Sequence, residues 1–593
     1  MLQLSAHLHL HRDTCNVYVV TNGAEAVLID CGDGSVLDQL PSLGVERVQA
    51  VLLTHHHRDQ AQGLNRVVAA GAAVWVPHAE QDFFHSVEGL WQGRELYNSY
   101  NNRQDRFSLA ESVPVEGTLQ DYSTVTFAGH SFVVVPTPGH TTGSVSFIAE
   151  IDGRRVAFTG DLLAGPGKVW SLAATQWSYN GGEGIPGSIL SLLDLKERQL
   201  ARLLPAHGEP MADPDWAIAQ TVERLTALRD LRRQNPRLFL LREKPFEQIT
   251  PHLLRSRTSM ATYYVLLSES GKALFIDFGY DFMFGPASGA DRASRRPWLY
   301  TLPALKQQYG VSKIDAVIPT HYHDDHVAGC NLLRAVEGTQ VWAAVNFADV
   351  LANPSRYDLP CLWYDPIPVD RVLPLGEPIQ WEEYEITLYP QAGHTYYAVA
   401  IAFTVDGKRV VAQGDQNADG DGLFLNYVYK NGFRPQDYRE SAQLYRHLKP
   451  DLMISGHWDP IWVQPGYLEQ LLARGETLER LHQELLLPEA AASAWLQPYQ
   501  VTVAPGATTT IEVVVHNPFA NEAEAEVALR LPSGWKAEPV VAKVTVDPET
   551  DGSAYFKVTA PAAPARRVCV TADVTIDGRR FGELGEALFT VTD

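Results

Sequence analysis

The fold of this chain is decided by the stretch Thr320-His321-Tyr322-His323-Asp324-Asp325-His326. It follows the largely apolar residues 314–319, which have the composition of a short buried strand. On an extended backbone alternate side chains point to the same side, so His321 and His323 share one face. Asp325 and His326 can then turn toward a second point nearby. Imidazoles with a carboxylate are typical ligands of zinc and related ions, so the stretch predicts a site for two metal ions.

Single ligand-type residues follow at three later points, each after a short strand-like segment and a glycine. They are His394 after Gly393, Asp415 after Gly414 and His457 after Gly456. Glycine lets the backbone approach an ion without a side chain in the way. The four pieces together indicate one metal centre assembled from distant parts of the sequence.

The first half of the chain contains the same series. It consists of Thr54-His55-His56-His57-Arg58-Asp59-Gln60, followed by His140, Asp161 and His207. The step from the single histidine to the aspartate is 21 residues in both copies (140 to 161, and 394 to 415). A repeat of this length indicates a tandem duplication of a whole domain rather than a solenoid.

Both halves resemble the metallo-β-lactamase fold superfamily, whose signature is T-H-x-H-x-D-H followed by separate His, Asp and His motifs. The resemblance implies an α/β fold of two tandem αβ/βα four-layer sandwiches, over residues 1–245 and 246–487, with the metals at one sheet edge. Residues 488–593 change to short alternating strands separated by turn residues, which predicts an all-β sandwich. This last part resembles immunoglobulin-like accessory domains.

In the second half the resemblance supplies a complete ligand set. It implies that one ion is held by His321, His323 and His394, and the other by Asp325, His326 and His457, with Asp415 bridging. Two nearby cations lower the pKa of a shared water toward neutrality and so supply hydroxide as a nucleophile. Asp325 is the candidate catalytic residue that orients this hydroxide or relays a proton.

In the first half the resemblance places metal ligands at His55, His57, Asp59, His140, Asp161 and His207. Gln60 stands where the family has histidine, and Asp59 is the catalytic counterpart of Asp325. A neutral amide is a poorer zinc ligand than imidazole, so one or two zinc ions are expected here, against two in the second half. One alternative stays open, because persulfide dioxygenases of this fold use iron held by two His and one Asp. Those positions correspond here to His55, His140 and Asp161. A degenerate, non-catalytic first domain is a further alternative.

Composition favours a soluble enzyme with a small-molecule substrate. The 593 residues exceed one domain, and 45% of them are hydrophobic. The net charge of −22 argues against binding to nucleic acid or to an anionic membrane. Five scattered cysteines indicate free, buried thiols in a reducing compartment. Neither a signal peptide nor a long apolar run is found in the sequence, so a cytoplasmic location is expected.

We therefore expect a zinc-dependent hydrolase that acts on an ester, lactone, thioester, amide or phosphoester, with the second domain as the active site. A binding or scaffold protein with vestigial sites is the other class. The C-terminal domain is expected to dock on the chain or to form a homo-oligomer. A helix is predicted over Ser188–Leu204. The aromatic insert 82–105 is interpreted equally as a helical cap packed on the body or as a lid over the first metal site, and the loop 280–300 is a candidate to overhang the second site.

Overall fold

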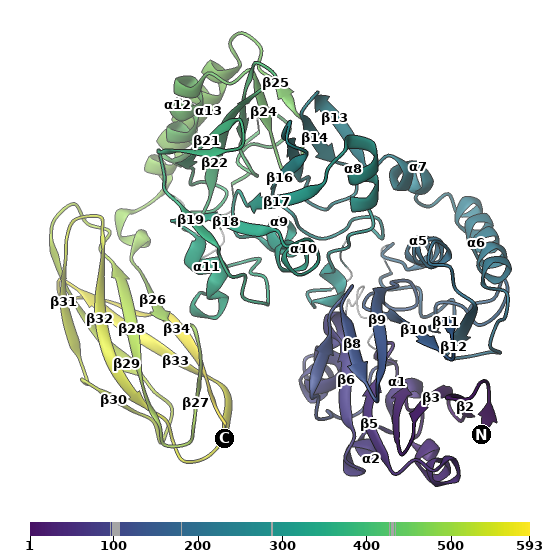
Figure 1. Cartoon of the computed structure of the whole chain (residues 1–593). Coiled ribbons are helices and arrows are strands. Elements are labelled where there is room, and N and C mark those ends of the chain that lie inside the picture. The colour runs from purple at the N-terminus through teal and green to yellow at the C-terminus, as the bar shows by residue number, and fades with distance from the viewer. Residues whose placement is uncertain are drawn as a thin grey trace. The chain divides into compact units, whose positions relative to one another are not determined.

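The computed structural model describes residues 1–94, 97, 107–179, 181–285, 287, 289–420, 422–425, 427, 432 and 434–592 (Figure 1). The chain divides into two compact units, each described here by itself. The first contains Met1–Ala316 with Ala328–Thr339, and the second contains Val317–Val327 with Gln340–Asp593. In the described part of the chain, no helix has the length and apolar character needed to cross a membrane.

Two sheets form the centre of the first repeat. The first has the order β1 (Leu2–Gln3), β2 (Leu8–Arg12), β3 (Asn16–Asn22), β4 (Glu25–Ile29), β5 (Arg47–Leu52), β6 (Ala73–Pro77) and β7 (Gly117–Leu119). The second has the order β12 (Arg202–Pro205), β11 (Arg154–Gly160), β10 (Val145–Ile151), β9 (His130–Pro136) and β8 (Thr124–Phe127). Side chains such as Tyr18 and Val27 from one sheet and Phe132 and Phe158 from the other share one buried core, so the sheets pack face to face.

Helices cover the outer faces of these two sheets. Four short helices lie in the sequence between strands of the first sheet: α1 (Arg58–Ala61), α2 (Leu64–Ala69), α3 (Asp82–His85) and α4 (Val87–Gln92). Three helices come after β11 of the second sheet: α5 (Ile185–Lys196), α6 (Pro214–Leu231) and α7 (Leu238–Glu243). Leu64 and Val87 pack on the first sheet, while Ile189 and Ile218 pack on the second. The predicted four-layer αβ/βα arrangement is therefore confirmed.

The predicted helix Ser188–Leu204 was wrong at its end. The helix α5 stops at Lys196, and residues from Arg202 form β12 instead, which pairs in parallel with β11. The apolar residues Leu203 and Leu204 are fully buried in that strand. Pairing with the sheet therefore overrode the helical pattern of the preceding residues.

The second repeat has the same element order. One sheet runs β13 (Phe246–Thr250), β14 (Leu253–Ser256), β15 (Tyr264–Leu267), β16 (Lys272–Ile276), β17 (Lys313–Ile318), β18 (Gln340–Ala344) and β19 (Arg371–Leu373). The other runs β20 (Pro378–Trp381), β21 (Tyr384–Pro390), β22 (Val399–Val405), β23 (Lys408–Ala412), β24 (Leu452–Ile454) and β25 (Ile461–Trp462). The helices are α8 (Leu302–Tyr309), α9 (Asp324–Val327), α10 (Cys330–Glu337), α11 (Ala348–Ala352), α12 (Asp437–Leu448) and α13 (Tyr467–Leu485).

The C-terminal part is all-β, as predicted. One sheet has the order β26 (Ser493–Gln497), β28 (Thr508–His516), β32 (Asp551–Thr559) and β30 (Lys536–Glu538). The other has the order β27 (Gln500–Val503), β34 (Arg579–Val591), β33 (Ala565–Ile576), β29 (Ala523–Arg530) and β31 (Ala542–Val546). Both contribute to one core that includes Phe556 and Phe589. The likeness to immunoglobulin domains and the three domain boundaries stay predictions.

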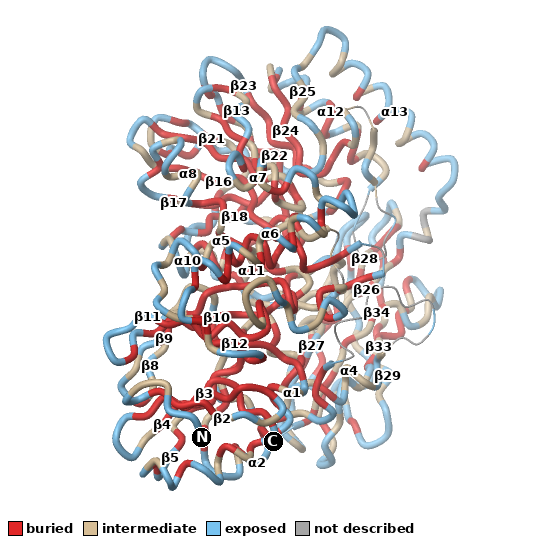
Figure 2. The backbone as a smooth tube through the Cα atoms, turned by 90° about the vertical axis from the view of Figure 1, so that its right-hand side faces the viewer, coloured by how far each residue is buried: buried red, intermediate tan, exposed pale blue. Residues whose placement is uncertain are grey.

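Burial along the chain follows this layering. Figure 2 shows buried residues along the central strands and exposed residues in the turns and along much of α13. All five cysteines are free thiols, but burial was predicted too widely. Cys15, Cys31 and Cys330 are buried, whereas Cys361 and Cys569 are exposed.

Candidate metal centres

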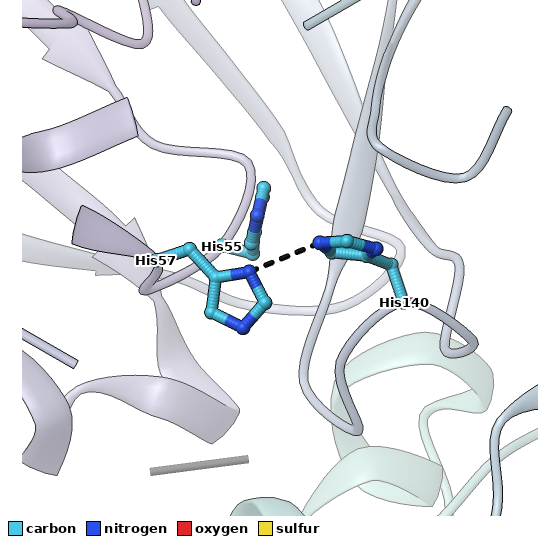
Figure 3. A group of neighbouring side chains, drawn as sticks. All are labelled: His55, His57 and His140. Atoms are coloured by element: carbon cyan, nitrogen blue, oxygen red, sulfur yellow. Dashed lines mark hydrogen bonds between the residues drawn. The ribbon is translucent and has the colours of Figure 1, made fainter. Parts of the chain in front are cut away.

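Most predicted ligands of the first repeat stand a few residues beyond the end of a strand, while Asp59 and Gln60 lie on the short helix α1. The strand β5 leads into His55 and His57, β9 leads into His140, β11 into Asp161 and β12 into His207. Because these strand ends lie at one edge of the two sheets, the side chains meet there. His55, His57 and His140 are buried and offer ligand atoms within 4.8 Å of one another. His140 Nε2 lies 3.0 Å from His57 Nδ1 (Figure 3).

The second repeat assembles the larger ligand set around one carboxylate oxygen. Asp415 Oδ2 lies 3.3 Å from His326 Nε2, 3.6 Å from His394 Nε2 and 3.1 Å from His457 Nε2. His457 Nε2 is also 3.2 Å from Asp325 Oδ2. His321, His323 and His394 form one group that could hold an ion, and Asp325, His326 and His457 form another. All seven residues predicted from the sequence are therefore brought together.

Buried polar atoms show that metal ions fit these centres. His55 Nε2, His321 Nε2 and Asp415 Oδ1 are buried and have no hydrogen-bond partner among the described residues. Burial lowers the pKa of His55 and of His323 to about 3, so both imidazoles are neutral and keep a lone pair for an ion. Leaving such atoms unsatisfied would cost free energy that a bound cation recovers.

Hydrogen bonds to the far side of three imidazoles orient them. Thr54 Oγ1 lies 3.0 Å from His55 Nδ1, and Thr320 Oγ1 lies 3.1 Å from His321 Nδ1. His394 Nδ1 donates to the carbonyl oxygen of Phe424 at 3.2 Å, so its Nε2 is the unprotonated nitrogen. Such partners fix the tautomer and the ring plane that a metal ion needs.

The second ion position differs between the repeats. Gln60 Nε2 donates to Asp161 Oδ2 at 3.0 Å, and His207 Nδ1 lies 2.7 Å from Asp161 Oδ1. His207 Nε2 in turn lies 3.1 Å from the carbonyl oxygen of Thr14. Asp59, Asp161 and His207 still lie close enough to surround an ion. In the first repeat, however, protein hydrogen bonds already occupy both oxygens of Asp161.

Aromatic rings flank ligands of both centres. Trp170 stacks on His207 with a centroid distance of 3.8 Å, and Phe107 lies 4.9 Å from the ring of His57. In the second repeat Phe424 stacks on His394 at 5.0 Å and meets Trp458 edge-on, and Trp458 lies beside His457. Both centres therefore have apolar rings beside their last histidine ligand, and the second also has one stacked on His394.

The insert 82–105 packs as the cap that was one of its two interpretations, whereas the loop 280–300 does not lie where it was expected. Phe84 and Trp91 of the 82–105 insert pack into or against the core beside the first sheet, and Phe83 stacks on His56. Tyr100 lies outside the described residues. Phe284 and Trp298 of the 280–300 loop, expected at the second site, pack into or against the core of the first repeat instead. Both segments contain apolar residues that contribute to structural cores rather than to lids.

Glu80 is a buried acidic residue near the first site that the sequence did not reveal. Its carboxylate accepts hydrogen bonds from the backbone N–H of His56 at 2.8 Å and of Gly143 at 3.1 Å. It also lies 3.0 Å from His56 Nδ1. Burial alone would raise the pKa of Glu80, but His56, Thr141 and the backbone donors hold it at about 2. Its only sequence signal is its position just after β6.

Comparison with known proteins agrees with this geometry. The sequence pattern of the Metallo-beta-lactamase superfamily matches residues 11–207 and 260–457. A hydroxyacylglutathione hydrolase from Albidiferax ferrireducens is 28% identical over 183 residues, which are 30% of this chain and 55% of that protein. An atrochrysone carboxyl ACP thioesterase from Aspergillus fumigatus is 25% identical over 232 residues, 37% of this chain and 61% of that protein. The chain thus spans somewhat more than half the length of these two relatives.

A partial match to a solved structure is also found. A metallo-beta-lactamase family protein from Thermus thermophilus is 22% identical, with a TM-score of 0.31, and the match covers 39% of this chain and 82% of that one.

Because the superfamily pattern covers most of the chain, in two copies, this chain belongs to the metallo-beta-lactamase superfamily.

Proposed function

We propose that the second repeat is a metal-dependent hydrolase centre that uses two zinc ions. The observation that carries the proposal is the convergence of His326, His394 and His457 on one oxygen of Asp415. When bound there, a pair of ions lowers the pKa of a coordinated water and polarises the bond to be cleaved. The complete ligand set also argues against a scaffold protein with vestigial sites.

The protein's own residues bind the ions and handle a proton. His321, His323 and His394 hold one position, Asp325, His326 and His457 hold the other, and Asp415 faces both. Asp325 Oδ2 lies 3.2 Å from His457 Nε2, so it can accept a proton released within the centre. Burial opposes a charge on His457, but Asp325 and Asp415 raise its pKa to about 9. An arriving ion must therefore displace a proton from this ring.

We further propose a thioester as the first substrate class to test. Two relatives support it by name, a hydroxyacylglutathione hydrolase and a thioesterase. Phe424 and Trp458 support an apolar acyl group, because Phe424 is exposed beside His394 and the partly buried Trp458 lies beside His457. Esters, lactones, amides and phosphoesters remain comparison substrates.

The first repeat is proposed to hold one zinc ion firmly, at His55, His57 and His140. Iron is the second candidate, because Asp161 Oδ2 lies 3.4 Å from His140 Nε2 and 3.7 Å from His55 Nε2. Two histidines and one carboxylate with open positions suit non-haem iron. Elemental analysis of the purified chain separates the two metals, and oxygen consumption tests the oxygenase alternative.

Metal removal tests the proposed hydrolysis directly. The full chain is assayed against a panel of thioesters, esters and lactones before and after dialysis against a chelator. We expect hydrolysis to stop without metal and to return when zinc is added. Equal rates in the metal-free and metal-loaded protein would overturn the proposal. A cytoplasmic location, a small-molecule substrate without nucleic-acid or membrane partners, and homo-oligomerisation through the C-terminal domain remain proposals beside it.

A further inference from the structure

The loop Gly139–Ser144, which carries His140, is held by two opposite charges. On one side Glu80 accepts hydrogen bonds from the hydroxyl of Thr141 and from the N–H of Gly143. Glu80 comes from the same repeat and also binds the backbone of His56, next to two metal ligands. This side of the loop is therefore fixed by the first repeat itself.

The other side of the loop is held by Arg296, which belongs to the second repeat. Arg296 Nη1 donates to the carbonyl oxygens of Thr142 and Ser144, both at 3.0 Å. Its Nε donates to Asp121 Oδ2 at 2.9 Å, and Nη2 donates to the other oxygen of Asp121. Arg296 is only 6% exposed, so this is a fully engaged, buried guanidinium. The planar fork of arginine suits such simultaneous contacts.

The corresponding loop of the second repeat, which carries His394, is supported by a side chain of its own repeat. Gln416, directly after Asp415, accepts from the N–H of His394 at 3.1 Å and donates to the carbonyl oxygen of Ala392 at 2.8 Å. In the first repeat the residue after Asp161 is Leu162, which is buried and has no polar group to offer. The first repeat therefore has no counterpart of Gln416, and Arg296 supplies a polar side chain on the side of the loop away from Glu80.

We propose that Arg296 is a positioning residue of the first metal centre, so that this centre is completed by a segment of the second repeat. The segment is seated next to the centre by further contacts. Phe284 and Trp298 pack into or against the first repeat's core, and Arg292 Nη1 lies 2.6 Å from Asp82 Oδ2. Loss of Arg296 removes the side-chain donor that joins the carbonyl groups of Thr142 and Ser144, within four residues of His140, and lets that ligand drift. The carbonyl oxygen of Ser144 keeps only its backbone bond from the N–H of Thr137 among the described contacts. The proposal concerns metal binding and holds whether or not the first centre hydrolyses anything.

Cobalt binding to the full chain tests the proposal. The parent carries His321→Ala and Asp415→Ala, so that the first centre dominates the titration. In competition with a chelator, Arg296→Met is expected to weaken cobalt binding about 10- to 100-fold, the usual effect of losing an outer partner of a metal ligand. The visible spectrum of the bound cobalt is expected to change as well, which a loss of stability alone would not produce.

Arg229→Met is the matched control, because Arg229 is likewise a buried arginine but its guanidinium lies beside Asp230 and over the ring of Phe239. It is expected to leave both affinity and spectrum unchanged. Arg296→Lys keeps a cation beside Asp121 but cannot reach both carbonyl groups, so it decides the question if Arg296→Met fails to fold. Parental affinity and spectrum in the Arg296 variants, or equal losses in Arg229→Met, would overturn the proposal.

Discussion

Gln60 donates its side-chain N–H to Asp161 Oδ2 across 3.0 Å, at the position where the second repeat turns His326 Nε2 toward Asp415 Oδ2 at 3.3 Å. The amide thus occupies the oxygen whose counterpart on Asp415 meets three imidazoles in the second repeat. Together with the contact from His207 to the other oxygen of Asp161, it leaves the first repeat with an amide where the second repeat has an imidazole. The two centres of one chain are therefore unequal.

Metal content measures this inequality. We expect the purified chain to hold about three zinc ions, two in the second centre and one in the first. Gln60→His supplies the missing imidazole and should raise the content to about four. The reciprocal change His326→Gln should lower it to about two. Elemental analysis of the three proteins checks this, and identical contents in all three would contradict it.

Thr320 is expected to tune metal binding without being a ligand. Thr320→Val removes the hydroxyl beside His321 Nδ1, which should weaken zinc binding at the second centre about 10-fold. The measurement is a chelator competition titration. Thr339→Val is the control, because Thr339 donates a similar buried hydrogen bond to Ile314 far from the ligands in sequence. Both variants should lose about 1 kcal/mol of stability, and only Thr320→Val should lose affinity.

Glu80 is expected to make the metal-free protein sensitive to acid. The pKa of Glu80 is about 2 in the fold against an ordinary value of 4.5, so the folded state prefers the carboxylate. This contribution to the free energy of unfolding is complete above about pH 4.5 and is lost as the pH falls toward 2. Glu80→Gln should destabilise the protein by about 3 kcal/mol at neutral pH and flatten the pH dependence in that window.

Urea unfolding from pH 6 downward, with metal removed, measures this effect. The exposed Glu150 lies on β10 and provides the control Glu150→Gln, which should retain the wild-type pH dependence. Parallel curves for the wild type and Glu80→Gln would show that the buried carboxylate does not govern acid stability.

The ligands could be predicted from the sequence because they stand after the ends of strands or, like Asp325 and His326, on the short helix that follows, each with its own local signature. His321 and His323 follow β17 directly, and the copy around His55 repeats the spacing. Arg296 could not be predicted, because its partner Asp121 is 175 residues away and the loop gives no local sign of it. Phe424 could not be predicted either, because it orients His394 through its backbone carbonyl oxygen and not through its side chain. The segment Arg202–Pro205 was misread as helix because only the neighbouring strand β11 makes it a strand.

The central claim is that hydrolysis belongs to the second centre and depends on its metal ligands. The most direct test compares Asp415→Asn with the matched variant Asp161→Asn in the zinc-loaded full chain, using kcat/KM for the thioester that responds best. Asp415→Asn is expected to lower kcat/KM at least about 100-fold, because it removes the charge that faces both ions. Asp161→Asn should stay within about twofold of the wild type, a difference below 1 kcal/mol. Full activity in Asp415→Asn, or its loss in Asp161→Asn alone, would contradict the assignment of catalysis to the second repeat.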